Sequence, residues 1–68
     1  MNHDLNILRL PAVMRRTGMA RSTINLRIKQ GEFPEPISLG HRNIGWIEEE
    51  ITLWIKQRIQ QSRKKELL

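Results

Sequence analysis

The stretch from Thr17 to Gly31 constrains the fold of this chain more than any other. Gly18 indicates a turn that ends a first helix, because glycine adopts the left-handed conformation at a helix C-terminus without steric cost. Gly31 marks the end of a second helix for the same reason, and that helix begins near Ala20 or Arg21. The stretch therefore predicts two short helices joined by a tight turn.

The second predicted helix has a narrow apolar face and a wide polar one. At about 100° per residue, Ile24 and Ile28 lie within roughly 40° of each other. The side chains that point away from them are those of Ser22, Asn25, Leu26 and Lys29. Such a helix suits the DNA major groove, which admits one helix and is read by hydrogen-bonding side chains. The pattern predicts a helix-turn-helix, and the alternative is a helical hairpin that only packs.

Composition narrows the class of protein. The chain has 68 residues, so a single domain with a small core is the upper bound. Its net charge of +5 favours nucleic acid or an acidic membrane surface as a partner, and the lack of cysteine excludes disulfides and thiolate metal sites. No apolar run is long enough to span a bilayer, and the first four residues lack the features of a secretion signal. We expect a soluble, basic protein of the cytoplasm.

The first helix of the pair is expected from Pro11 to Thr17, after a short extended segment from Ile7 to Leu10. Proline is favoured at the first helical position because its missing N–H costs nothing there. Arg15 and Arg16 face away from the apolar side of this helix, and the first helix of such a pair crosses the DNA backbone. Both arginines are therefore candidate phosphate contacts, with a solvated helix face as the alternative.

The second helix carries the candidate base contacts. Asn25 is the main one, because its amide can form two hydrogen bonds with an adenine edge. Ser22 is assigned to base contact as well, and Leu26 meets either a thymine methyl group or a protein partner. The side chains assigned to the DNA backbone are Arg21, Thr23, Arg27 and Lys29. For Thr23, whose hydroxyl lies near free N–H groups of the helix, a mainly structural role is favoured.

A small β-hairpin is predicted after the helix pair. Ile37–Leu39 alternates like a strand, residues 40–43 form a turn, and Ile44–Trp46 is a second short strand. A hairpin in this place is the wing of a winged helix, whose tip lies on the DNA backbone or in the minor groove, where arginine is favoured. Arg42 is the main contact expected at the tip. His41 and Asn43 are weaker candidates, with ordinary turn chemistry as the alternative for both.

The last helix is expected to begin at Glu48 and to pack an apolar stripe on the rest of the domain. Its three leading glutamates favour the helix dipole, and they cannot converge on one metal ion because consecutive side chains diverge. The stripe comprises Ile47, Ile51, Trp54, Ile55 and, at its end, Arg58, whose stem can be buried while its charged head stays in water. The predicted domain covers residues 8–60, between a flexible N-terminus of residues 1–7 and a basic C-terminal tail of residues 61–68.

No catalytic, cofactor or metal site is predicted. The two histidines are far apart in the sequence, Asp4 is the single aspartate, and cysteine is absent. No nucleophile–base pair and no phosphate-binding loop can be assembled from these residues. An enzyme is therefore the least favoured class of function.

Several motifs, in this order, resemble the AlpA family of prophage regulators. They are Leu10–Val13, Thr17–Ile24, Ile28–Pro34, Gly40–Arg42 with Gly45–Trp46, and Ile51–Ile55. The resemblance spans about residues 8–59. It implies a compact winged helix-turn-helix, mainly α with a small β-hairpin, like the fold of excisionases and of the MerR DNA-binding domain. It also implies DNA binding by phage or genomic-island proteins, some of which activate transcription while others act in excision.

Two places depart from the family pattern. Such sequences commonly have serine at the position of Ala20, so the usual helix cap is absent here. They also often have tyrosine and then arginine at the positions of Asn25 and Leu26, so the DNA sequence that is read is expected to differ. Arg42 matches the wing arginine of the family.

Three functions compete on this basis. A sequence-specific transcriptional regulator that binds double-stranded DNA is favoured. An excisionase-like recombination directionality factor would use the same surface, and a winged helix that binds protein only is the third. A single small module buries only about 600–1,000 Å² on DNA, so a homodimer or cooperative self-association on DNA is expected. RNA polymerase and a recombinase are the further partners considered.

Overall fold

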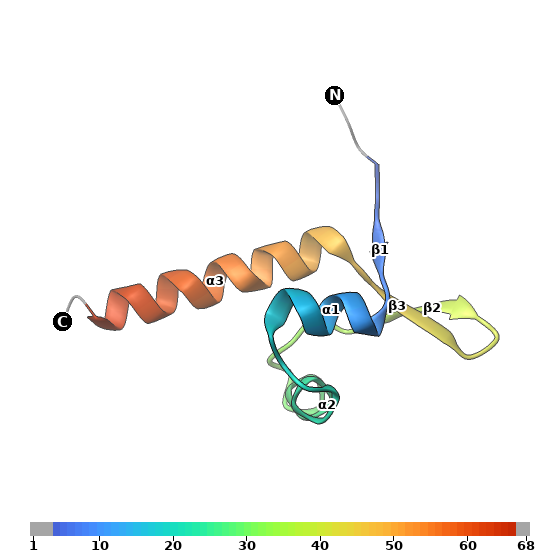
Figure 1. Ribbon diagram of the computed structural model, residues 1–68, viewed down its shortest axis with the longest axis horizontal. Helices are drawn as coiled ribbons and strands as arrows, with labels where there is room; N and C mark the ends of the chain where they lie inside the picture. Colours follow the sequence, from blue (N-terminus) through green and yellow to red (C-terminus); the bar gives the residue numbers. More distant parts are fainter. Residues whose placement is uncertain (1–3, 67–68) are drawn as a thin grey trace.

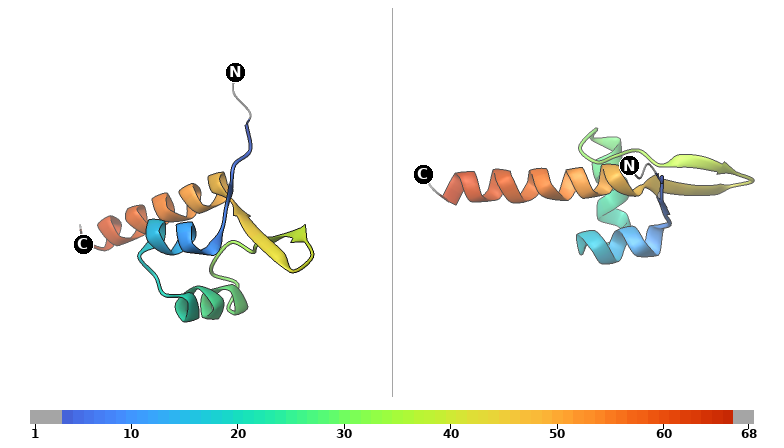
Figure 2. Two further views of the ribbon diagram at one scale, coloured as in Figure 1. Left: turned by 45° about the vertical axis from the view of Figure 1, so that its right-hand side comes forward. Right: turned by 90° about the horizontal axis from the view of Figure 1, so that it is seen from above.

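The computed structural model describes residues 4–66, which form three helices and three short strands. In chain order these are β1 (Ile7–Leu8), α1 (Leu10–Thr17), α2 (Arg21–Lys29), β2 (Ile37–Gly40), β3 (Asn43–Ile47) and α3 (Glu48–Glu66). In Figure 1, α1 and α2 lie below α3, and the β2–β3 hairpin projects away from the C-terminal half of α3. The two further views in Figure 2 show the same opposed projections. The predicted mainly helical fold with a small hairpin is confirmed.

The turn between α1 and α2 has the predicted geometry. Gly18 adopts a left-handed conformation with φ of 72°, and its N–H donates to the carbonyl of Met14 at 2.8 Å. The Thr17 hydroxyl donates to the carbonyl of Val13 at 2.8 Å and accepts from the N–H of Met19 at 3.2 Å. Gly31, with φ of 74°, follows the end of α2. Helix α1 begins at Leu10, one residue before the predicted start.

The predicted hairpin is present, and it belongs to a three-stranded antiparallel sheet with the order β1-β3-β2. Ile7 pairs with Ile47 and so joins β1 to β3. The glycine in the middle of β3, Gly45, allows this close approach. A Cβ atom there would overlap Ile7 Cγ2 and lie 3.2 Å from both the Leu8 carbonyl oxygen and Leu39 Cδ1. Ile7 is thus part of the sheet, although the predicted boundary left it in a flexible N-terminus.

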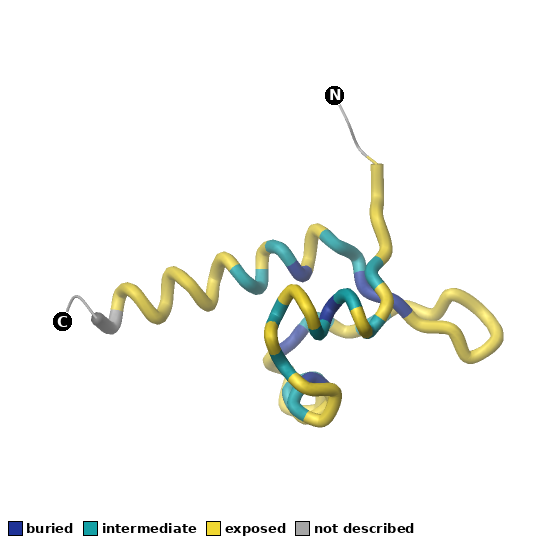
Figure 3. The backbone as a smooth tube through the Cα atoms, in the orientation of Figure 1, coloured by how far each residue is buried: buried dark blue, intermediate teal, exposed yellow. Residues whose placement is uncertain are grey.

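The core is small and draws one residue from nearly every segment. Its buried side chains are Val13, Ile24, Phe33, Trp46 and Ile51. The indole N–H of Trp46 donates to the Pro34 carbonyl at 3.0 Å, and that of Trp54 donates to the Glu32 carbonyl at 2.8 Å. These two bonds hold the loop after α2 against the sheet and α3, and the first gives the N–H of the buried Trp46 a partner. Figure 3 shows the buried segments where α1, α2, β3 and the start of α3 meet.

Helix α3 begins at the predicted residue but is longer than expected. It continues to Glu66, so residues 61–66 are helical rather than part of a separate tail, and residues 67–68 lie outside the described range. After Gly45 the chain has neither glycine nor proline, and the residues after Ile59 are mainly Gln, Lys, Arg and Glu, which are good helix formers. No helix within residues 4–66 is long and apolar enough to cross a membrane.

Candidate nucleic-acid interface

Helix α2 presents a polar and basic face to solvent because its apolar face is fixed in the core. Ile24 is fully buried, and the half-buried Ile28 packs against the same cluster. Asn25 and Lys29, the positions on which the predicted role depends, are both exposed. The other exposed side chains of this helix are Arg21, Ser22 and Leu26, while Thr23 and Arg27 are half-buried. The structure therefore leaves all three candidate base contacts accessible.

Leu26 is an unusual member of this face. Its side chain is apolar and 54% exposed, whereas the other exposed side chains of α2 are polar or charged. An exposed leucine beside an exposed asparagine gives α2 one apolar contact and one hydrogen-bonding contact for a groove. This pairing matches the thymine methyl group and the adenine edge of an A·T pair, which both lie in the major groove.

No side chain caps the N-terminus of α2. The capping position is taken by Ala20, which has no oxygen to offer to the free N–H groups of the first turn. Neither the Ser22 hydroxyl nor the Thr23 hydroxyl forms a cap. Ser22 is exposed and Thr23 is half-buried, so Ser22 is the better placed of the two for an external partner.

The tip of the β2–β3 hairpin is held in an unusual backbone conformation. His41 and Arg42 have φ angles of 48° and 68°, and both are exposed. Two consecutive left-handed residues match the twist of a two-residue hairpin, and this turn is normally built from Asn and Gly. For arginine the conformation costs about 1–2 kcal/mol. Strain of this kind persists only where the surrounding structure imposes it and often marks functional sites.

An arginine that the sequence analysis did not single out lies beside the hairpin. The Arg9 guanidinium donates to Oδ1 of Asn43, the first residue of β3, at 3.4 Å. Arg9 is exposed and follows β1 directly. Its position depends on the pairing of β1 with β3, and the two partners of that pairing are 40 residues apart in the chain. No local signal in the sequence places Arg9 near the wing.

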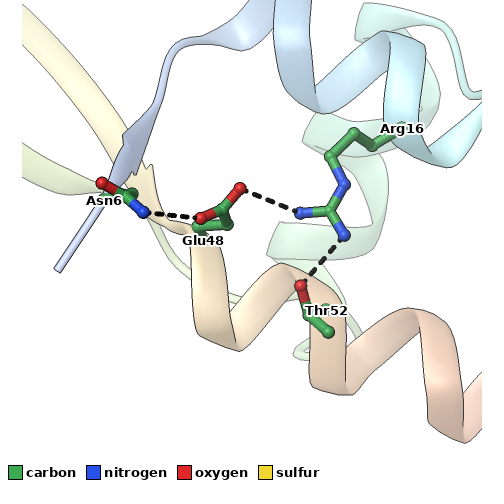
Figure 4. A network of polar contacts seen from close by, with 4 residues as sticks. All are labelled: Asn6, Arg16, Glu48 and Thr52. Carbon is green, nitrogen blue, oxygen red and sulfur yellow. Dashed lines mark hydrogen bonds and ion pairs between the residues drawn. The ribbon is translucent and has the colours of Figure 1, made fainter. Parts of the chain in front are cut away.

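The two arginines of α1 have different environments. Arg16 donates to Thr52 Oγ1 at 2.9 Å and lies 3.8 Å from Glu48 Oε2, as Figure 4 shows. Glu48 in turn accepts a hydrogen bond from the side-chain amide of Asn6 at 3.0 Å. Arg16 thus joins α1 to α3, and its predicted phosphate contact stays a prediction. Arg15 is exposed and has no hydrogen-bond or ion-pair partner among residues 4–64.

Basic and acidic residues are segregated along the chain. Residues 5–31, which contain α1 and α2, carry six Lys or Arg and no Asp or Glu. Five of the seven acidic residues follow in residues 32–50, in the loop after α2 and at the start of α3. The helix pair is therefore uniformly positive, which attracts the phosphate backbone. Among the described residues, no group of three or more His, Asp or Glu is placed to hold a metal ion.

Comparison with known proteins gives consistent results. The sequence profile of the family described as "Prophage CP4-57 regulatory protein (AlpA)" matches residues 6–59. The DNA-binding transcriptional activator AlpA of Escherichia coli K12 is 48% identical over 60 residues, which cover 79% of this chain and 86% of that protein. An uncharacterised protein, ORF88, of Enterobacteria phage P4 is 48% identical over 52 residues. That match covers 76% of this chain but only 59% of the phage protein.

Proposed function

This chain belongs to the AlpA family of prophage regulatory proteins, and we propose that it is a DNA-binding transcriptional regulator. The family is one of regulators and not of enzymes. In this proposal α2 enters the major groove, and Asn25, Ser22 and Leu26 contact base edges. The protein acts where bacterial DNA is found, in the cytoplasm.

A single observation carries the proposal. Two isoleucines of α2 are covered by the core, while the opposite side of the same helix is accessible and bears Asn25 and Lys29. A helix whose only role was packing would not need an uncovered face of this kind on a segment that lacks every acidic residue. The lack of acidic residues in 5–31 also favours DNA over a protein partner.

Phosphate contacts would supply most of the affinity. The exposed cations near α2 are Arg15, Arg21 and Lys29, with Arg27 half-buried beside them. At the wing, Arg42 and His41 would meet the backbone or the minor groove, with Arg9, whose guanidinium lies on Asn43 next to the hairpin tip, as a further contact. Each neutralised phosphate releases counterions, so affinity is expected to fall steeply with salt. We leave Arg16 out of this set because its guanidinium is bound to α3.

Titration of the ¹⁵N-labelled protein with a duplex oligonucleotide at low ionic strength tests the proposal. Amide signals of α2 and of residues 40–43 should shift, while those of the second half of α3 should move little. If the α2 signals stay in place while the protein still binds, the interface lies elsewhere.

A footprint on the intergenic DNA of the host element then identifies the role. A site beside a promoter supports transcriptional control, and direct repeats at an attachment site would instead support an excision factor. Contacts with RNA polymerase or with a recombinase stay predictions until such a site is known.

A further inference from the structure

An open groove runs beside α3 on a part of the molecule that has no role in the proposed DNA contacts. It has a volume of about 820 Å³ and lies between residues 31–37 and the first half of α3. The α3 residues that line it include Glu50, Leu53, Trp54 and Gln57. Leu53 is 54% exposed, so the groove offers an uncovered apolar side chain next to the half-buried Trp54.

The groove is acidic as well as apolar. Glu32 and Glu35 line it on the loop side, and Glu50 lines it on the helix side. Arg58 is the one cation among the lining residues, so the groove keeps a net negative charge. These three carboxylates repel DNA phosphates, which separates the groove from the nucleic-acid interface. Charge complementarity suits it to an element that is basic and partly apolar.

The same chain carries such an element. Between residues 51 and 65 it has five Lys or Arg and no Asp or Glu. Residues 59–64 of α3 are all exposed, and this half of the helix extends away from the rest of the molecule (Figures 1 and 3). A helical segment of this length is marginal in water without packing. The protein therefore presents both an acidic groove and an uncovered basic helix.

The groove and the basic segment share one face of α3. Glu50, Gln57 and Lys64 are spaced by seven residues, which returns a side chain to the same face after about two turns. An antiparallel pair of α3 helices centred on Gln57 would place Glu50 of each copy opposite Lys64 of the other. A parallel pair would instead place the acidic starts of both helices side by side.

We propose that a second copy of this chain binds in the groove through an antiparallel pairing of the two α3 helices. Each basic half then lies in the acidic groove of the other copy, and the contact occurs twice around a two-fold axis. The pairing is closed and stops at a dimer. Because most of the shared face is polar, the dimer is weak and is favoured at low ionic strength. The proposal does not rest on DNA binding.

Charge reversal in the absence of DNA tests the pairing, and the chain offers matched controls. Glu50→Lys and Lys64→Glu should each raise the dimer dissociation constant roughly tenfold, since every dimer contains the altered pair twice. The double variant should return to within about threefold of the original value. Glu49→Lys and Arg63→Glu change the same charges on adjacent residues that line other hollows of the surface, and they should have little effect. Sedimentation velocity at low ionic strength gives these constants.

A cysteine at the axis provides a geometric test, because the natural chain has none. In Gln57→Cys the two thiols should meet and form an intermolecular disulfide quickly when oxidised glutathione is added. Ser62→Cys lies about 140° around the helix from Gln57 and should cross-link much more slowly. The indole N–H signal of Trp54 should also shift with protein concentration, while that of Trp46, which is 2% exposed, should not.

Two results would overturn the pairing. One is a protein that stays monomeric at low ionic strength up to the highest soluble concentration. The other is association that persists while Gln57→Cys cross-links no faster than Ser62→Cys, which would assign self-association to a different surface. Neither result bears on DNA binding by α2, which is measured separately.

Discussion

Neighbouring residues of α2 have opposite environments, and this contrast separates stability from recognition. Ile24 is fully buried and Asn25 is exposed. We predict that Asn25→Ala leaves the free energy of unfolding almost unchanged but weakens binding to the best DNA site by about 1–3 kcal/mol. Binding to random DNA should change little, because phosphate contacts remain. Fluorescence anisotropy with both duplexes measures this, with Gln60→Ala on α3 as the control. Equal losses on both duplexes would contradict base reading by Asn25.

The two adjacent arginines of α1 differ in their contacts and should therefore differ in their roles. Arg15→Ala should make the dependence of log affinity on log salt shallower by roughly one unit without altering stability. Arg16→Ala should lower the free energy of unfolding by about 0.5–1 kcal/mol, because it removes the link to Thr52 and Glu48. Its salt slope should change less than that of Arg15→Ala. Urea unfolding and binding at several salt concentrations test the pair, and the reverse assignment would show that Arg16 leaves α3 to bind DNA.

Arg42 combines strain with charge, so its replacement should separate the two. Arg42→Gly removes the left-handed strain at φ of 68° and should hold or raise the free energy of unfolding by up to about 1 kcal/mol. The same change should weaken binding to all DNA and lower the salt slope by roughly one unit. Arg42→Lys keeps both the charge and the strained conformation, so its slope should stay near the original. An unchanged slope in Arg42→Gly would remove the wing tip from the interface.

At the scale of elements, local signals in the sequence were sufficient for the helix pair and the hairpin. Gly18 and Gly31 each mark the end of a helix by a single residue, and the alternation in residues 37–46 predicts two strands. The sequence predicts an extended segment at Ile7–Leu10 but not its pairing with β3, because Ile7 and Ile47 are far apart in the chain. Helix α3 extends past the predicted start of the C-terminal tail, because the change in composition after Gln60 brings neither a glycine nor a proline to end the helix.

A single substitution at the start of α2 should raise the stability of the fold. Ala20 leaves the N-terminus of this helix without a side-chain cap. Ala20→Ser should raise the free energy of unfolding by about 0.5–1 kcal/mol, since its hydroxyl can accept a hydrogen bond from an N–H of the first turn. Ala20→Val, which adds bulk without an oxygen, should give no such gain. Chemical denaturation of both variants measures the effect, and equal stability of the two would show that the first turn is satisfied in another way.

For the whole molecule, the sequence predicts the exposure of individual site residues but not the contacts between elements that surround them. The period of α2 identified Ile24 as buried and Asn25 as exposed, because burial of one helix face follows from spacing alone. The bond of Arg16 to α3 and the position of Arg9 beside the hairpin depend on tertiary packing. The acidic groove likewise exists only once residues 32–37 fold against α3.

The distribution of the core leads to a prediction about the complete chain. Among the described residues, the five buried hydrophobic side chains lie between positions 13 and 51, and the last side chain packed against them is Ile55. A truncation after Ile59 should therefore fold with a melting temperature within about 3 °C of the full chain, since a loss of under about 0.5 kcal/mol shifts so small a domain little. Because Lys64 is then absent, dimers should disappear in sedimentation while the salt slope for DNA stays nearly the same. A large loss of stability would show that the exposed half of α3 supports the fold. A clearly shallower slope would place that half on DNA instead of on a second copy.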